Sequence, residues 1–178
     1  MSSEEYGRTT PRRSNRRNQT VVRLPLTVVA DIADLAALQT RVIAQDQLVV
    51  VVSETHRISD QRSIAFADVV GEPFVGLADA ALEVYLGERA ARLGRQIHYR
   101  IQLRRIENIA MMVESGVGIA ILSEASAKDL VRLRLAIVPL RDRWALRRLH
   151  LCARDFSALT PHASLLAQQL MEPKVDIP

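Results

Sequence analysis

The hydrophobic positions along this chain fall into short segments separated by polar turns. Five consecutive apolar residues at 48–52 form a run that suits a strand buried on both faces, because such strands show no polar alternation. Short apolar or alternating runs predict strands over 21–30, which is rich in β-branched residues, and over 40–52, 73–77, 97–103, 117–122, 135–140 and 146–154.

Between these strands, apolar residues recur at three- and four-residue spacing, which predicts amphipathic helices. One stripe predicts a helix over 80–93, with Asp79 placed to cap its start and Gly94 to end it. A second stripe, from Ile106 to Val113, is stopped by Gly116. Shorter helices are predicted over 63–70 and over 124–131, the latter with Ser123 as its cap.

The last predicted helix opens with Thr160 and Pro161, a capping residue followed by a proline in the first turn. We expect it to bury one apolar stripe made of Ala163, Leu166, Ala167 and Leu170. Helices that alternate with short apolar strands indicate an α/β architecture with a mainly parallel sheet.

Charge is distributed unevenly along the 178 residues. The first 23 residues hold six of the 24 basic residues and only two of the 20 acidic ones, which leaves 18 of each sign in residues 24–178. The net charge of +4 therefore belongs to an Arg-rich arm that shows no hydrophobic period and that we expect to be disordered. We expect such an arm to make at most a salt-sensitive contact with DNA that does not depend on the base sequence.

A single cysteine, Cys152, excludes an intrachain disulfide and fits a reducing cytoplasm. Because it lies in the apolar run 149–153, we interpret it as a buried hydrophobe rather than a nucleophile. No run approaches the roughly 20 apolar residues of a membrane span. The segment 12–30 does not match an export signal, since Arg23, Pro25 and Asp31 interrupt its apolar part.

Candidate catalytic and metal motifs are weak. Gly116 and Gly118 begin a partial G-x-G-x-x-G pattern, but Ile121 takes the third glycine position and the glycines precede a strand, so a tight turn is the better interpretation. The four histidines show no metal-ligand spacing, and no serine lies in a nucleophile motif. We therefore expect no metal, no cofactor and no enzyme activity. The arginines of 141–148 are interpreted as a solvated loop rather than a phosphate site.

Three stretches, taken together, resemble the effector-binding domain of LysR-type transcriptional regulators. They are TRVIAQDQLVVVVSETHRIS, SIAFADVVGEPFVGL and IENIAMMVESGVGIAILSEASA, the last with Ser123 where the family more often has proline. The terminal LAIVPL and HLCARDFSALTPHASLLAQQL resemble the return strands and final helix of the same domain. The resemblance covers residues 28–171 in the family's order.

This resemblance implies a fold like that of type 2 periplasmic binding proteins, in which two Rossmann-like α/β subdomains joined by crossover strands close on a small effector. It implies a second subdomain over 54–135 and an incomplete first subdomain over 24–53 and 136–178, preceded by the arm at 1–23. It also implies effector contacts from Arg41, Ser53, the turn Leu77, Ala78, Asp79 and Ala80, and the turn Gly116, Val117 and Gly118.

Each of those residues also has a structural explanation that the sequence leaves open. Arg41 suits an exposed strand position, Asp79 a helix cap, and the glycines a turn. A carboxylate at the start of a helix would repel a carboxylate ligand, so we hypothesise that a site containing Asp79 prefers a neutral or cationic effector, or one anchored elsewhere. The carboxylates of Asp79 and Glu83 could meet on one helical turn, but a capping Asp79 and a solvent-facing Glu83 explain them equally well.

The chain departs from the family pattern at its start, where we expect neither the DNA-binding helix-turn-helix nor the first strand–helix–strand unit. An incomplete first subdomain would expose an apolar edge, so self-association or association with a related regulator is expected, and no specific DNA contact. Two alternatives stay open: a solute-binding protein of the same fold, and a truncated partner that heterodimerises with full-length regulators.

Overall fold

The computed structural model describes residues 27–30, 38–78, 81–130 and 133–172. The predicted arm at 1–23, the loop after residue 30, Asp79 and Ala80 lie outside the described residues, in whole or in part. The strands and helices follow the predicted alternation: β1 (Thr27–Ala30), β2 (Gln39–Ser53), α1 (Phe66–Val69), β3 (Pro73–Leu77), α2 (Ala81–Arg92), β4 (His98–Leu103), α3 (Ile106–Glu114), β5 (Ala120–Ser123), α4 (Glu124–Lys128), β6 (Leu135–Pro139), η1 (Arg143–Ala145), β7 (Leu146–Ala153), η2 (Phe156–Ala158) and α5 (Pro161–Met171).

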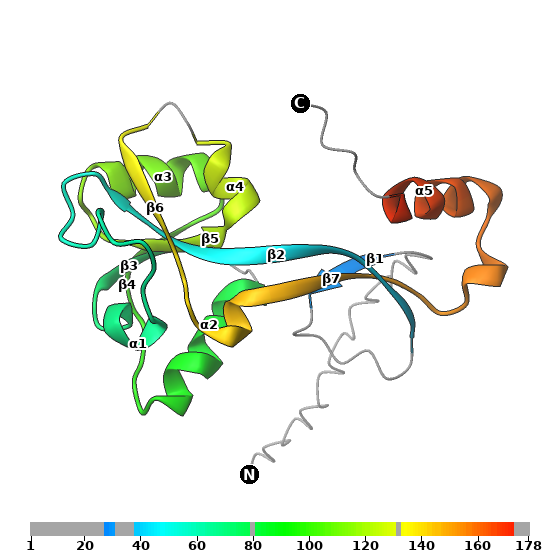
Figure 1. The fold of residues 1–178 in the computed structure, drawn as a ribbon, viewed down its shortest axis with the longest axis horizontal. Coiled ribbons are helices and arrows are strands. Elements are labelled where there is room, and N and C mark those ends of the chain that lie inside the picture. The colour runs from blue at the N-terminus through cyan, green and yellow to red at the C-terminus, as the bar shows by residue number, and fades with distance from the viewer. Residues whose placement is uncertain (1–26, 31–37, 79–80, 131–132, 173–178) are drawn as a thin grey trace, which may run out of the picture.

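The 15-residue strand β2 joins two parts of the molecule (Figure 1). Its second half, Leu48–Ser53, lies between β5 and β6 in a lobe that also contains α1 to α4. Its first half pairs with β7, and β1 pairs with the other side of β7, so that these strands form an antiparallel ribbon that leaves the lobe. Helix α5 lies at the far end of the ribbon (Figure 1).

Strand direction differs between the lobe and the ribbon. β3 and β4 are parallel. The Val75 amide donates to the Ile119 carbonyl, and the Ile119 amide donates to the Pro73 carbonyl, each at 2.8 Å. The segment that enters β5 is therefore parallel to β3. β5 and β6 are both antiparallel to β2. The order in the lobe is therefore β4-β3-β5-β2-β6 with only β2 reversed, which confirms the mainly parallel sheet. The ribbon is antiparallel throughout, and there the prediction is wrong.

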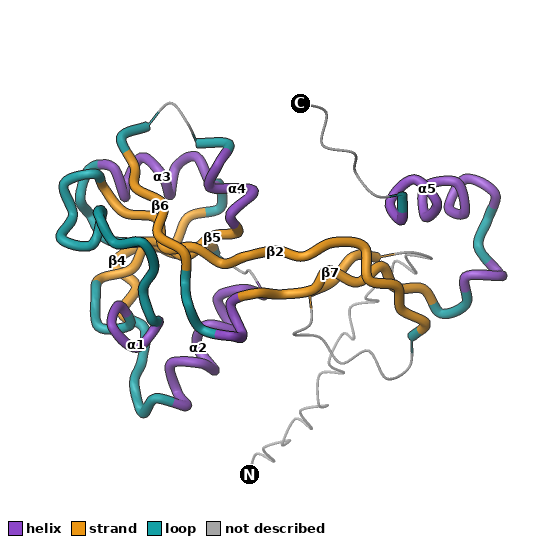
Figure 2. Tube along the Cα trace, in the orientation of Figure 1, coloured by secondary structure: helices purple, strands orange, loops and turns teal. Residues whose placement is uncertain are grey.

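The apolar run 48–52 is buried on both faces, as its composition predicts. Leu48, Val50 and Val52 pack in a core with residues of α1 and α2, while Val49 and Val51 pack in a second core with residues of α3 and α4. Figure 2 shows these two pairs of helices on opposite sides of the strands. The lobe is thus a three-layer α/β unit.

Several predicted helix signals are confirmed. The Ser123 hydroxyl accepts a hydrogen bond from the Ser126 amide at the start of α4, and the Thr160 hydroxyl accepts one from the Ala163 amide at the start of α5. Gly94 and Gly116 adopt positive φ angles of 66° and 74°, which glycine reaches without a Cβ penalty.

The expected buried stripe of α5 is wrong in most of its positions. Only Ala167 is buried, with 2% of its surface exposed, whereas Leu166 is 49% and Leu170 36% exposed. The reason is that, among the described elements, α5 packs mainly against β2, and the small residue Ala167 fills most of this contact. Leu165 and Met171 are exposed as well.

Candidate functional site

The parallel strands β3 and β4 end side by side and lead into α2 and α3. Leu77 and Leu103 are paired at this point, and the Ala78 amide donates to the Leu103 carbonyl at 2.7 Å. We call this the carboxyl edge, defined by Leu77, Ala78 and Leu103. In α/β sheets, ligands bind outside the carboxyl ends of parallel strands, because backbone donors and helix N-termini meet there.

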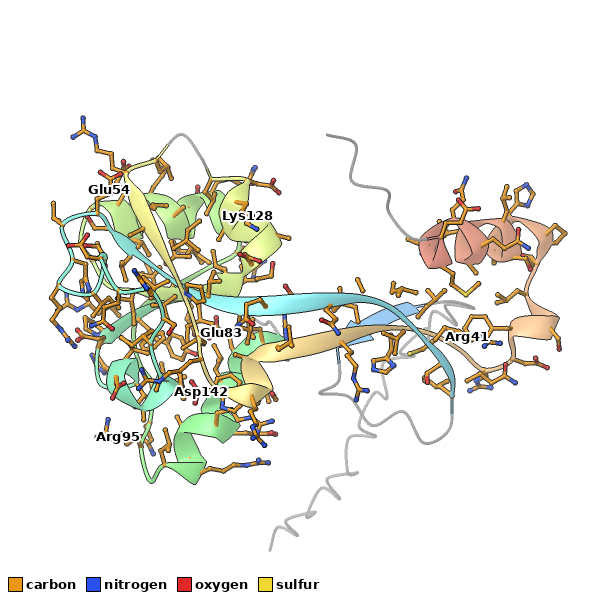
Figure 3. All side chains as sticks on the ribbon, in the orientation of Figure 1. Arg41, Glu54, Glu83, Arg95, Lys128 and Asp142 are labelled. Atoms are coloured by element: carbon orange, nitrogen blue, oxygen red, sulfur yellow. The ribbon has the colours of Figure 1, made fainter. Side chains whose placement is uncertain are left out.

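The carboxyl edge faces the ribbon. Leu48 pairs with Ser123 at the end of β5, whereas Ser53 pairs with Leu135 at the start of β6. The half of β2 that precedes Leu48 therefore leaves the lobe on the side where the parallel strands end. Figure 3 shows Glu83, whose carboxylate accepts a hydrogen bond from Leu77 of the carboxyl edge, on the side of the lobe where the ribbon begins.

Glu83, in the first turn of α2, bends back onto the carboxyl edge. Its Oε1 accepts a hydrogen bond from the Leu77 amide at 2.8 Å, and its Oε2 accepts one from the Tyr99 hydroxyl. No ion pair joins Glu83 to a basic side chain within the described ranges. The interpretation of Glu83 as a solvent-facing helix residue is therefore incomplete: the side chain is partly exposed, but its carboxylate bonds to the Leu77 amide and the Tyr99 hydroxyl.

Tyr99 reaches Glu83 because residue 76 is glycine. A Cβ at Gly76 would lie 2.6 Å from the Tyr99 ring and 3.3 Å from the Glu83 carboxyl carbon. Burial raises the pKa of the Tyr99 hydroxyl well above its usual range, and the hydrogen bond and negative charge of Glu83 raise it further. Tyr99 thus stays a donor. Its role was not found from the sequence, because His98–Leu103 looks like any half-exposed strand.

The structure separates the predicted site residues into three places. Leu77 and Ala78 lie at the carboxyl edge, next to Asp79 and Ala80, which are outside the described residues. The other end of the sheet, where β3 and β6 begin, we call the opposite edge. Ser53 lies there, paired with Leu135 at the start of β6. The turn Gly116, Val117 and Gly118 lies there too, since a Cβ on Gly118 would meet the Pro73 carbonyl at the start of β3. With about 3.3 Å per residue, the two edges are ~13 Å apart along β3.

Arg41 lies in the ribbon and contacts neither edge. Its side chain is exposed, and its guanidinium carbon lies 5.8 Å from the centre of the Phe156 ring. Figure 3 shows it far along the ribbon, toward α5. It precedes Leu48 by seven positions, or ~23 Å along an extended strand.

The opposite edge contains a shallow hollow of about 410 Å³ lined by Ser53, Glu54, Thr55, Glu114 and Arg134. Its groups already bond to one another: Glu114 accepts from the Arg134 amide at 2.9 Å, and the Ser53 and Thr55 hydroxyls are 3.2 Å apart. The hollow is open and lined by polar and charged residues, unlike the enclosed apolar pockets that hold small ligands.

A buried ion pair joins the two strands where the ribbon meets the lobe. Asp46 of β2 and Arg147 of β7 lie opposite each other, and their side chains are only 9% and 10% exposed. Next to them, the Gln47 amide group donates to the carbonyls of Leu48 and Leu140. For Arg147, the interpretation as part of a solvated arginine loop is wrong, since it lies in β7 with its side chain only 10% exposed; its partner lies 101 residues earlier in the chain.

Helix α2 is tied to η1 by an arginine between two aromatic rings. The Arg89 guanidinium carbon lies 4.5 Å from the Tyr85 ring centre and 5.4 Å from that of Trp144. The Tyr85 hydroxyl accepts from Arg89 and donates to the Trp144 carbonyl. These contacts fix α2, and with it Glu83, against the segment that leads into β7.

The described residues contain no group of three or more side chains able to hold a metal ion, and none of their helices is long and apolar enough to span a membrane. Cys152 is buried in β7, and burial raises the pKa of its thiol, which keeps it protonated and unreactive.

Residues 22–173 match the family model described as LysR substrate binding domain. The chain belongs to this family. The members of this family are regulatory effector-binding domains, and the lobe and crossover strands of the LysR domain described here have the type 2 periplasmic-binding-protein fold. None of the curated proteins compared with the sequence matches it.

Solved structures of LysR-type proteins show the same fold at low identity. The regulatory domain of CcmR from Synechocystis PCC6803, in complex with 2-PG, matches with a TM-score of 0.70 and 19% identity over 86% of this chain and 75% of that one. The effector-binding domain of QuiR in complex with shikimate matches with a TM-score of 0.68 and 16% identity over 83% of this chain and 70% of that one. A full-length BenM variant matches with a TM-score of 0.67 and 16% identity, and the match covers 83% of this LysR domain and half of the BenM chain.

Proposed function

We propose that this chain is the sensory part of a LysR-type transcriptional regulator and binds a small-molecule effector at the carboxyl edge. The observation that carries this proposal is the meeting of the β3 and β4 ends with the first turns of α2 and α3 on the side of the lobe that faces the ribbon. Family membership supports it, as do related domains solved with shikimate, benzoate and 2-PG.

Of the residues expected to contact the effector, Leu77 and Ala78 have the strongest support, because they form this edge. Ser53 and the Gly116–Gly118 turn lie ~13 Å away along β3, too far for one small molecule to touch both sets. Arg41 lies on the ribbon and would contact an effector only with the ribbon and lobe drawn together.

A screen by thermal unfolding tests the proposal. The full chain is melted with shikimate, benzoate and neutral and cationic compounds of similar size. A ligand that binds the folded state stabilises it by RT ln(1 + [L]/Kd), about 2.7 kcal/mol at a hundredfold excess over Kd. At least one compound is expected to raise the Tm in a saturable manner. No response across a broad panel would contradict effector binding by this chain.

We also propose the subdomain division 24–53 with 136–178, and 54–135. The passage of β2 and β7 between the lobe and the ribbon supports it, although β6 itself packs in the lobe. Limited proteolysis tests the division: the first cuts are expected in the ribbon, and a lobe fragment should survive.

Self-association, or association with a related regulator, is the proposed mode of assembly in the cytoplasm, without membrane contact and without a specific DNA contact from this chain. The exposed leucines of α5 support association. Sedimentation velocity at several protein concentrations is expected to show a shift from monomer to a larger species. A single monomeric species at all concentrations would contradict it.

A further inference from the structure

The carboxyl edge holds a negative charge that no described basic residue neutralises. The two carboxylate oxygens of Glu83 each take one hydrogen bond, from Leu77 and from Tyr99, and both donors are neutral. An ionised carboxylate offers about four acceptor positions, so roughly two remain free. Because the side chain is partly exposed, these free positions can meet a ligand.

Glu83 also occupies the backbone donor that an anionic ligand would need. The Leu77 amide belongs to the last residue of β3, and it already donates its hydrogen bond to Glu83 at 2.8 Å. A carboxylate that took this amide would have to displace Glu83, or lie against it with like charges in contact. Each alternative lowers the affinity for anions.

Neighbouring charges do not reverse this preference. Arg105, which follows β4 at the same edge, pairs with Glu107 in the first turn of α3. Arg104 is exposed, where its charge is screened by solvent. Glu83, by contrast, is held in place by two hydrogen bonds and by the close fit of Tyr99 over Gly76.

We propose that Glu83 makes this edge selective for small cations of the amine or amidine class and keeps carboxylates from the Leu77 amide. This inference rests on the proposed function. It predicts an ion pair between the ammonium or amidinium group of the effector and the free acceptor positions of Glu83, with the apolar part of the ligand against Leu77 and Leu103.

Three probes of one size test the proposal: benzylamine, benzyl alcohol and benzoate, which differ in charge. Binding to the full chain is measured by NMR titration for the wild type, Glu83→Gln and Glu88→Gln. Glutamine keeps an acceptor for the Leu77 amide and removes the charge. Glu88 is exposed on the same helix and serves as the matched control. Circular dichroism confirms that each variant is folded.

Benzylamine is expected to bind the wild type and Glu88→Gln alike and to lose at least about tenfold in affinity in Glu83→Gln, while benzoate binds Glu83→Gln better than the wild type. Equal benzylamine affinity in the wild type and Glu83→Gln would overturn the inference. So would benzoate binding to the wild type at least as tight as to Glu83→Gln, although effector binding itself would then stand. No response to any probe or to the broad panel would remove both.

Discussion

At the scale of single residues, two glycines of the lobe are required by what lies next to them. A Cβ at Gly118 would lie 2.4 Å from the Pro73 carbonyl oxygen, and one at Gly76 would enter the Tyr99 ring. Sequence reasoning identified the turn at Gly116, which the positive φ angle confirms. It did not identify the need at Gly118, because that need arises from strand pairing across 45 residues rather than from local turn geometry.

Gly118→Ala is expected to lower the free energy of unfolding by about 1–3 kcal/mol, since the added methyl group meets the Pro73 carbonyl oxygen, which accepts a hydrogen bond from the Ile119 amide. Chemical denaturation measures the change. Gly71→Ala is the control, because a Cβ there has no neighbour within 4 Å. Equal stability of Gly118→Ala and the wild type would mean that β3 and the start of β5 are not paired as described.

Tyr99 provides a pH-dependent signal. Its pKa is raised in the folded chain, so the folded state keeps a proton that the unfolded state loses above pH ~10. This contribution to stability is therefore complete below pH ~10 and is lost as the pH rises further. The ionisation of Tyr99 is the difference between the 295 nm absorbance titration curves of the wild type and of Tyr99→Phe. We expect this difference to appear only together with unfolding. Ionisation of Tyr99 at the pH of an ordinary tyrosine in the folded chain would be inconsistent with the Glu83 contact.

At the scale of elements, periodicity located nearly every strand and helix, because alternation and stripes are local properties of the sequence. β3 was predicted with the bounds Pro73–Leu77 that the structure shows. What a helix face contacts is not local: the apolar stripe of α5 looks like a buried stripe, yet Leu166 is 49% exposed. The position of Arg147 escaped prediction for the same reason, since its partner Asp46 is distant in sequence.

The Asp46–Arg147 pair links β2 to β7 where the ribbon leaves the lobe. Asp46→Ala is expected to destabilise the chain by about 3–5 kcal/mol, because it leaves the buried Arg147 guanidinium without its counter-charge. Arg141→Ala, which breaks the exposed pair with Asp68, should cost at most about 1 kcal/mol. Thermal and urea unfolding of both variants give the comparison. A loss for Asp46→Ala as small as that for Arg141→Ala would show that the pair is solvated.

At the scale of the whole molecule, one lobe is complete as a three-layer unit, and a long ribbon carries α5 away from it (Figure 1). The sequence motifs led to the family and to the fold, because they lie in the strands and turns that build the lobe. They did not resolve the site, since residues on both edges of one sheet resemble the family's cleft residues equally well. Only the strand directions separate Leu77 and Ala78 from Ser53 and Gly118.

Amide NMR with any compound that raises the Tm shows where an effector binds. Saturating ligand at the carboxyl edge is expected to shift the amide signals of Leu77, Ala78 and Tyr99, while those of Gly116 and Gly118 stay within the spread of the remaining lobe. Shifts confined to Ser53, Gly116, Gly118 and Arg134 would contradict binding at the carboxyl edge and place the effector at the opposite edge.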